Sequence, residues 1–304
     1  MKTVVFAQGG MGIMGIRRLL LDGFTVDLIV SDRDQPGCSV DMVSVEDLAR
    51  ELSIPCVFPA NPNQFGWMER IRDLKPDMIF SLGYRRELKR QLLAIPAHGA
   101  FAVHESYLPL FRGPCPVNWA IIRGEASTGV TLFEMTDQPY AGPVLVQRRV
   151  DIAPLETART LSDRLMHEAD TMLAGILPRM KSLDIPRTPQ DPSQATTFGE
   201  LTPEDGRITW EKPATELFNL IRACSPPHAG AFGLLGDDMV FFRWALPAQD
   251  VHHEPGAIVT SGETVLVGTG YGCLRPEEIE VNGRTLKGSA LTRFFHEHRG
   301  ESLQ

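Results

Sequence analysis

Apolar runs that fit buried strands alternate with helical periods through about the first half of this 304-residue chain. Such an order predicts an α/β fold, in which a parallel sheet has helices on both faces and ligands at the carboxyl ends of its strands. We expect a further strand pair at residues 128–135 and 144–152, and a long helix over residues 157–183. The predicted strands are residues 3–7, 25–30, 56–58 and 77–82, and the predicted helices between them are residues 14–21, 45–52 and 66–74.

The rest of the chain predicts a second, smaller domain. Residues 186–205 are rich in Pro, Thr, Gln and Ser and have no clear period, which is typical of a linker. Short apolar segments follow, separated by turns that contain glycine, and they predict a small β-barrel. We therefore expect a first domain over residues 1–185, a linker over 186–205 and a second domain over 206–304.

Composition excludes several classes of function. The net charge of −8 disfavours nucleic acid as a partner, because such proteins neutralise phosphates with basic patches. No apolar window approaches the roughly 20 residues that cross a bilayer, and the first residues are too short for a secretory signal. We expect a cytoplasmic protein that does not bind membranes. The five cysteines, Cys38 among them, are scattered and never in Cys-x-x-Cys spacing, so neither a disulfide framework nor a metal site is indicated.

Two local features suggest phosphate or nucleotide binding. Gly10, Gly12 and Gly15 follow the first strand, and Asp32 ends the second, as in a dinucleotide-binding turn; the alternative is a tight turn that needs glycine for packing. The basic residues between positions 85 and 90 form either a solvated helix face or a small site for an anionic ligand.

The densest pattern of polar and special residues lies between residues 99 and 147. Residues 101–109 read Phe-Ala-Val-His-Glu-Ser-Tyr-Leu-Pro, and they are followed by Arg112-Gly113, by Thr-Gly-Val-Thr at 128–131 and by Gly142-Pro143. The order and spacing resemble the 10-formyltetrahydrofolate-dependent formyltransferases, in which Asn-x-His-x-Ser-Leu-Leu-Pro precedes an Arg-Gly turn, a Thr-Gly-Val-Thr strand and an Asp-x-Gly. The match extends over most of the chain.

Within that family, the chain looks most like the domain that formylates UDP-4-amino-4-deoxy-L-arabinose, and its last third is similar to methionyl-tRNA formyltransferase. The resemblance implies a Rossmann-like domain with a small open β-barrel behind it. Because the sequence ends at Gln304, we expect no second catalytic domain. The implied activity is transfer of a formyl group from 10-formyltetrahydrofolate to the amine of a small acceptor such as an amino-sugar nucleotide.

The resemblance also implies roles for particular residues. His104 is the expected catalytic residue, because imidazole titrates near neutrality and can carry a proton. The chain has Ala102 where the family has its Asn, and Tyr140 where the family has its Asp. The residues implied in cosubstrate binding are Tyr84, Arg86, Leu88, Thr136 and Asp137, and those implied in substrate binding are Met11, Gly12, Ser106, Arg112 and Gly113.

The two departures leave several hypotheses open. Ala102 cannot donate a hydrogen bond, and loss of one such donor costs on the order of 100- to 1,000-fold in kcat. Glu105 or Asp137 could substitute for a missing group, giving an enzyme with altered chemistry. Alternatively, the chain is a pseudoenzyme that binds folate or nucleotide sugar without turnover, or the two positions were substituted deliberately. A Tyr140 ring that fills the cleft beside His104 would argue against folate binding there, and a ring turned outward would favour a repurposed transferase.

Overall fold

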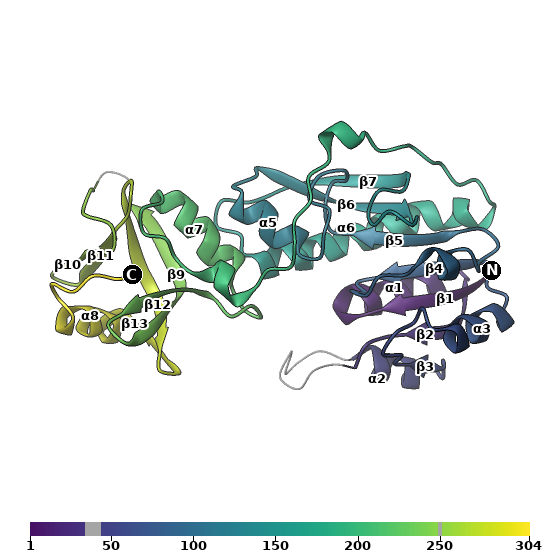
Figure 1. Ribbon diagram of the computed structural model, residues 1–304, viewed down its shortest axis with the longest axis horizontal. Helices are drawn as coiled ribbons and strands as arrows, with labels where there is room; N and C mark the ends of the chain where they lie inside the picture. Colours follow the sequence, from purple (N-terminus) through teal and green to yellow (C-terminus); the bar gives the residue numbers. More distant parts are fainter. Residues whose placement is uncertain (34–43, 249–250) are drawn as a thin grey trace. The chain divides into compact units, whose positions relative to one another are not determined.

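The computed structural model describes residues 1–33, 44–248 and 251–304, which fall into two compact units (Figure 1). Cys38 lies outside the described residues. Unit 1 comprises Met1–Pro116, Ser127–Asp151 and Ser162–Gly199, and unit 2 comprises Val117–Ala126, Ile152–Leu161 and Glu200–Gln304.

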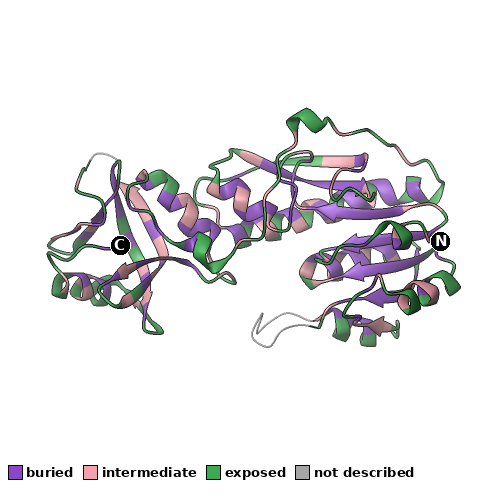
Figure 2. Ribbon diagram, viewed as in Figure 1, coloured by how far each residue is buried: buried purple, intermediate pink, exposed green. Residues whose placement is uncertain are grey.

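Unit 1 is built on a seven-stranded sheet in the order β3-β2-β1-β4-β5-β6-β7. Strands β1 to β5 pair in parallel, whereas β5–β6 and β6–β7 pair antiparallel. The central strands are buried along nearly their whole length, as continuous apolar runs require in a sheet covered on both faces (Figure 2). The strands are β1 Lys2–Ala7, β2 Thr25–Val30, β3 Cys56–Val57, β4 Met78–Leu82, β5 Ala100–His104, β6 Ser127–Glu134 and β7 Val144–Asp151.

Helices connect the parallel strands, and α1 packs against β1, β2 and β4. The expected long helix is present as α6, Ala158–Lys181. Helix α5, Pro116–Ile122, lies almost entirely in unit 2, and α6 continues from unit 2 into unit 1. The other helices between the strands of unit 1 are α1 Gly9–Leu21, α2 Val45–Glu51, α3 Phe65–Asp73 and α4 Arg90–Leu93.

The glycines at the start of α1 are needed for packing. A Cβ atom on Gly12 would lie 2.9 Å from the Cβ of Ala7, and one on Gly15 would lie 2.4 Å from Cδ1 of Leu82. The carboxylate of Asp32 accepts a hydrogen bond from Arg86 Nε at 2.7 Å. The glycines and the acidic residue that suggest a dinucleotide turn therefore have internal roles that need no dinucleotide.

Unit 2 contains a six-stranded antiparallel sheet, in which β13 pairs with β12 beside the path β10-β11-β12-β9-β8. Its core is a cluster of buried residues that includes Trp210, Phe242, Ile279 and Phe295. The elements are α7 Ala214–Ala223, β8 Ala231–Leu235, β9 Asp238–Ala248, β10 Ile258–Ser261, β11 Thr264–Gly268, β12 Cys273–Val281, β13 Arg284–Lys287 and α8 Gly288–Glu297.

The fold class expected from the sequence, a Rossmann-like α/β domain with a smaller β domain, is confirmed. The domain boundaries at residues 185 and 205 stay a prediction. Four cysteines in the described part are free thiols: Cys56, Cys115, Cys224 and Cys273. None of the helices in that part is long and apolar enough to span a membrane.

Candidate active site

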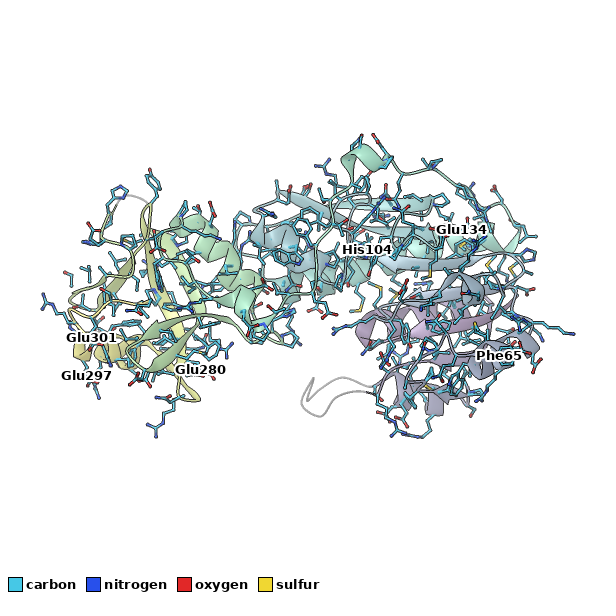
Figure 3. All side chains as sticks on the ribbon, viewed as in Figure 1. Phe65, His104, Glu134, Glu280, Glu297 and Glu301 are labelled. Carbon is cyan, nitrogen blue, oxygen red and sulfur yellow. The ribbon has the colours of Figure 1, made fainter. Side chains whose placement is uncertain are left out.

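His104 ends β5, at the carboxyl edge of the parallel strands of unit 1. Its side chain is buried, and Nε2 lies 3.0 Å from the backbone oxygen of Phe111. Burial lowers the pKa of His104 to about 4, against the opposing effect of that hydrogen bond, so the imidazole is neutral at pH 7. A neutral ring that donates from Nε2 to a carbonyl leaves Nδ1 with a lone pair. In Figure 3, His104 and Glu134 mark opposite ends of the paired strands β5 and β6.

Tyr140 stands against His104. The two ring centroids are 4.7 Å apart with an interplanar angle of 43°. The phenol ring also packs with Phe133, against the small buried cluster that includes Ala102, and its burial raises the pKa of the hydroxyl. The fold thus brings together the three positions singled out by the sequence, Ala102, His104 and Tyr140. The ring faces the imidazole, which is the orientation that argues against a folate group reaching His104 while Tyr140 stays in place.

The turn that carries Tyr140 is held by Gln190. Tyr140 has a φ of +59°, in the left-handed region that few non-glycine residues adopt. Gln190 Nε2 donates to the backbone oxygen of Tyr140 at 2.8 Å and to that of Gly142 at 2.7 Å. Gln190 Oε1 accepts a hydrogen bond from Arg112 Nη2 at 2.7 Å. Gln190 therefore connects the tyrosine turn to the Arg-Gly turn.

Two side chains on the neighbouring strands hold the loop after His104. Thr131 Oγ1 donates to the backbone oxygen of Ser106 at 2.7 Å, and Gln147 Nε2 donates to that of Leu108, also at 2.7 Å. The fully buried Ser106 hydroxyl donates to the backbone oxygen of Leu110. The Thr-Gly-Val-Thr strand and Ser106 therefore fix the His104 loop by hydrogen bonds.

The turn at Arg112-Gly113 is held in place by contacts with residues more than 80 positions further along the chain. Thr196 Oγ1 accepts a hydrogen bond from the amide of Phe111 at 2.8 Å, and the rings of Phe111 and Phe198 stack with centroids 5.2 Å apart. Gly113 has a φ of +129°, and a Cβ there would lie 2.0 Å from the backbone oxygen of Phe198. Only glycine fits this close approach.

The expected cosubstrate-binding side chains are mostly turned inward or paired. Leu88 is buried, and the Tyr84 ring packs edge-on against Phe6, with burial raising the pKa of its hydroxyl to about 12. Arg86 bonds to Asp32 and to the backbone oxygen of Ala60, and it lies before α4 rather than on a helix face. This loop can offer a ligand its backbone more readily than its side chains.

The remaining predicted residues differ in accessibility. Thr136 and Asp137 are exposed, and the Thr136 hydroxyl donates to the backbone oxygen of Gln138. Met11 and Gly12 are buried at the start of α1. Burial raises the pKa of Glu105 to about 7, while the positive charge of Arg85 acts in the opposite direction. Glu105, one of the two carboxylates considered as substitutes, is thus held in surroundings that make it titrate near neutrality.

Several residues that build the site give no signal in the sequence. Gln190 and Thr196 lie in the stretch that predicts a linker, where composition shows no period. Gln147 is followed by two arginines in β7, and nothing in that local pattern distinguishes it from other polar residues of a strand. Only their distances to the His104 loop and to the tyrosine turn identify them.

Two family models match this chain. Residues 29–177 match the model of the formyl transferase family, and residues 200–295 match the model of the formyl transferase C-terminal domain. Together these matches span most of the chain.

Solved structures share the fold at low sequence identity. The chain is similar to an N-formyltransferase from Helicobacter canadensis, in complex with folinic acid and dTDP-3-aminofucose, with a TM-score of 0.71, 17% identity and coverage of 91% of this chain and 98% of that one. It is also similar to WlaRD, a sugar 3N-formyl transferase solved with dTDP and 5-N-formyl-THF, with a TM-score of 0.70, 14% identity and coverage of 93% and 98%. HypX from Aquifex aeolicus, in complex with tetrahydrofolic acid, matches with a TM-score of 0.63 and 18% identity, over 98% of this chain and 48% of that one. The two family matches and the shared fold show that this chain belongs to the formyl transferase family.

Proposed function

We propose that this chain transfers a formyl group from 10-formyltetrahydrofolate to the amine of a small acceptor such as an amino-sugar nucleotide. The observation that carries the proposal is the His104 imidazole, held neutral at the carboxyl edge of the sheet by the Phe111 carbonyl. Relatives with this fold are described with folate compounds, and two of them with a nucleotide or nucleotide sugar. The net charge of −8 favours a small acceptor over tRNA.

In this proposal the acceptor amine attacks the formyl carbon and the bond from that carbon to N10 of the folate breaks. His104 takes the proton that the attacking amine releases and returns it to N10, so tetrahydrofolate leaves. The free lone pair on Nδ1 can accept the proton, and the low pKa keeps the ring unprotonated at pH 7. The same low pKa makes the imidazole a weak base, and Ala102 supplies no donor to the oxygen that becomes negative in the tetrahedral intermediate. We therefore expect slow transfer.

The folate cosubstrate supplies the formyl group, and two segments are proposed to bind it. The first is the loop of Tyr84, Arg86 and Leu88, and the second is the turn of Thr136 and Asp137. The first loop is braced by Asn63, whose side chain bonds to the backbone of Glu87 and of Lys89. A braced loop presents backbone groups at fixed positions, which supports recognition of a flat, polar ring system. We propose that Met11, Gly12, Ser106, Arg112 and Gly113 line or shape the acceptor side.

A second function, binding without turnover, is favoured by the Tyr140 contact. A separation of 4.7 Å between the two ring centroids leaves no space for a third group between them. Transfer at His104 therefore requires that the Tyr140 ring move, whereas a binding protein needs no such movement.

Binding and transfer are measured separately to decide between the two functions. Isothermal titration with a folate analogue and with nucleotide sugars measures binding, and a transfer assay with amino-sugar nucleotides measures turnover. The transferase proposal predicts slow turnover that rises on the order of 100-fold in the Ala102→Asn/Tyr140→Asp variant, because an oxyanion donor returns and the ring is removed. Tyr271→Asp, at an exposed tyrosine of unit 2, is the matched control. Binding without turnover, unchanged in the double variant, would instead establish the second function.

A further inference from the structure

Arg112 is a buried cation whose hydrogen-bonding capacity is mostly unused. The residue is 8% exposed, yet its guanidinium makes one hydrogen bond in the described part of the chain, from Nη2 to Oε1 of Gln190. Its Nε is buried without a partner among the described residues, and none of their carboxylates pairs with it. A guanidinium has five N–H donors, so most of its donors remain free.

The Gln190 partner cannot neutralise this charge. The Gln190 amide nitrogen donates to the backbone oxygens of Tyr140 and Gly142, which fixes its amide oxygen toward Arg112. That oxygen is the end of a neutral dipole. A charge taken out of water without an ionic partner is costly, and proteins rarely keep one unless it has a function.

Arg222 of unit 2 shows how this chain satisfies a buried arginine that has a structural role. Arg222 is 5% exposed, and all three of its nitrogens are bonded. Nε and Nη2 donate to Oδ1 of Asn219 at 3.0 and 2.8 Å, and Nη1 donates to the backbone oxygen of Glu156 at 2.9 Å. Arg112 has a similar degree of burial and one such bond. The difference indicates that the acceptors of Arg112 come from outside the chain.

We propose that Arg112 binds an oxyanion, a carboxylate or phosphate group of a ligand, beside the His104 site. Phe111, the residue before Arg112, holds His104, and Gln190 ties Arg112 to the turn of Tyr140, so the bound anion lies next to the reacting centre. A guanidinium fork matches the paired oxygens of either group. The inference rests on the proposed function only in placing this anion on the amine acceptor.

Anion binding is tested without formyl transfer. Inorganic phosphate and, separately, acetate are titrated into the full chain by calorimetry at constant ionic strength, and the melting temperature is recorded with and without each anion. The variants are Arg112→Met, which removes the charge, and Arg112→Lys, which keeps the charge without the fork. Arg149→Met is the control, because Arg149 is exposed on β7 and bonds only to the Ser127 hydroxyl in the described part of the chain.

We expect saturable binding to the wild-type chain and to Arg149→Met, with a rise in melting temperature that follows occupancy. Arg112→Met is expected to weaken binding at least about tenfold and Arg112→Lys by less, because charge-assisted bonds are lost. If Arg112→Met does not fold, Arg112→Lys decides. Tighter binding of phosphate identifies a phosphorylated ligand, and tighter binding of acetate identifies a carboxylate.

Two results would overturn the inference: no saturable binding of either anion to the wild-type chain, or unchanged binding in both Arg112 variants. Failure of the inference leaves the transfer assay unaffected. Conversely, a chain that binds phosphate at Arg112 but never transfers a formyl group would contradict the proposed function alone.

Discussion

Two arginines of unit 1, Arg86 and Arg112, differ in their exposure to solvent and in the partners of their guanidinium groups. Arg86 is exposed, yet its guanidinium bonds to the Asp32 carboxylate at 2.7 Å and to the backbone oxygen of Ala60 at 2.6 Å. Arg112 is buried, yet its described partner is one neutral amide. The charge of Arg86 is neutralised by Asp32 within the chain, whereas the charge of Arg112, beside His104, is available to a ligand. Basic residues by themselves therefore do not locate an anion site; the site lies where the fold withholds a counter-ion.

The largest effect is expected on the His104 side. His104→Gln should lower the rate of formyl transfer by about 100- to 10,000-fold, because the proton acceptor is lost. His296→Gln is the matched control, since the exposed His296 also contacts a backbone oxygen, that of Gly262. The measurement is the initial rate of transfer to an amino-sugar nucleotide. An unchanged rate in His104→Gln would remove His104 from the mechanism.

The next effect concerns the turn that holds Tyr140 against His104. A Cβ on Gly142 would lie 1.8 Å from the backbone oxygen of Glu134, so Gly142→Ala forces the turn to shift. We expect a loss of about 3 kcal/mol in the free energy of unfolding of unit 1, measured by urea titration.

Gly175→Ala serves as the control for that variant. Gly175 lies within α6, and a Cβ there meets nothing within 4 Å. This substitution should stabilise the chain by about 0.5–1 kcal/mol, because alanine favours a helix. Equal stability of the two variants would mean that the tyrosine turn is not constrained as described.

The pH dependence of stability tests whether the carboxyl of Glu105, the residue after His104, is withdrawn from solvent. Its pKa is raised from 4.5 to about 7 in the folded chain, so between these values the folded state keeps a proton that the unfolded state loses. Stability from this group therefore falls as pH rises from 4.5 to 7. Glu105→Gln should match the wild-type free energy of unfolding below pH 4.5 and exceed it above pH 7, by on the order of 1 kcal/mol.

The opposite contribution of His104 is common to both proteins in that comparison. Its pKa of about 4 lies below the ordinary 6.5, so stability from His104 rises with pH between these values. Because His104 contributes equally to the stability of both proteins, the difference in free energy of unfolding between wild type and Glu105→Gln reports on Glu105 alone. A difference that does not vary with pH would show that the carboxyl is solvated.

The smallest effect is expected at the internally neutralised arginine. Asp32→Asn removes the partner of Arg86, but the two side chains are 19% and 46% exposed, so the loss should be about 1 kcal/mol or less. Added salt should reduce the difference from wild type, because exposed charges are screened. The measurement is urea unfolding at low and high ionic strength. A loss well above 1 kcal/mol would show that the pair is effectively buried.

The sequence was sufficient for the frame of the molecule. Continuous apolar runs predicted β1, β2 and β4 within a residue or two, because strands buried on both faces need apolar side chains at every position. The order of the His104, Arg112 and Gly142 motifs identified the family that both domain matches confirm. The strands and the motifs depend on residues that are neighbours in the chain, so the sequence alone is enough to find them.

The tertiary structure alone decided which polar groups meet. The position of Gln190 between Arg112 and Tyr140 depends on contacts across 78 and 50 residues, and no periodicity encodes contacts of that range. The sequence by itself determined that Ala102 and Tyr140 replace the Asn and Asp that accompany the histidine in the family. Only the fold decided that Tyr140 covers the imidazole, that burial keeps it neutral, and that Arg112 is buried with a neutral partner, because burial and pairing are set by atoms far apart in the chain.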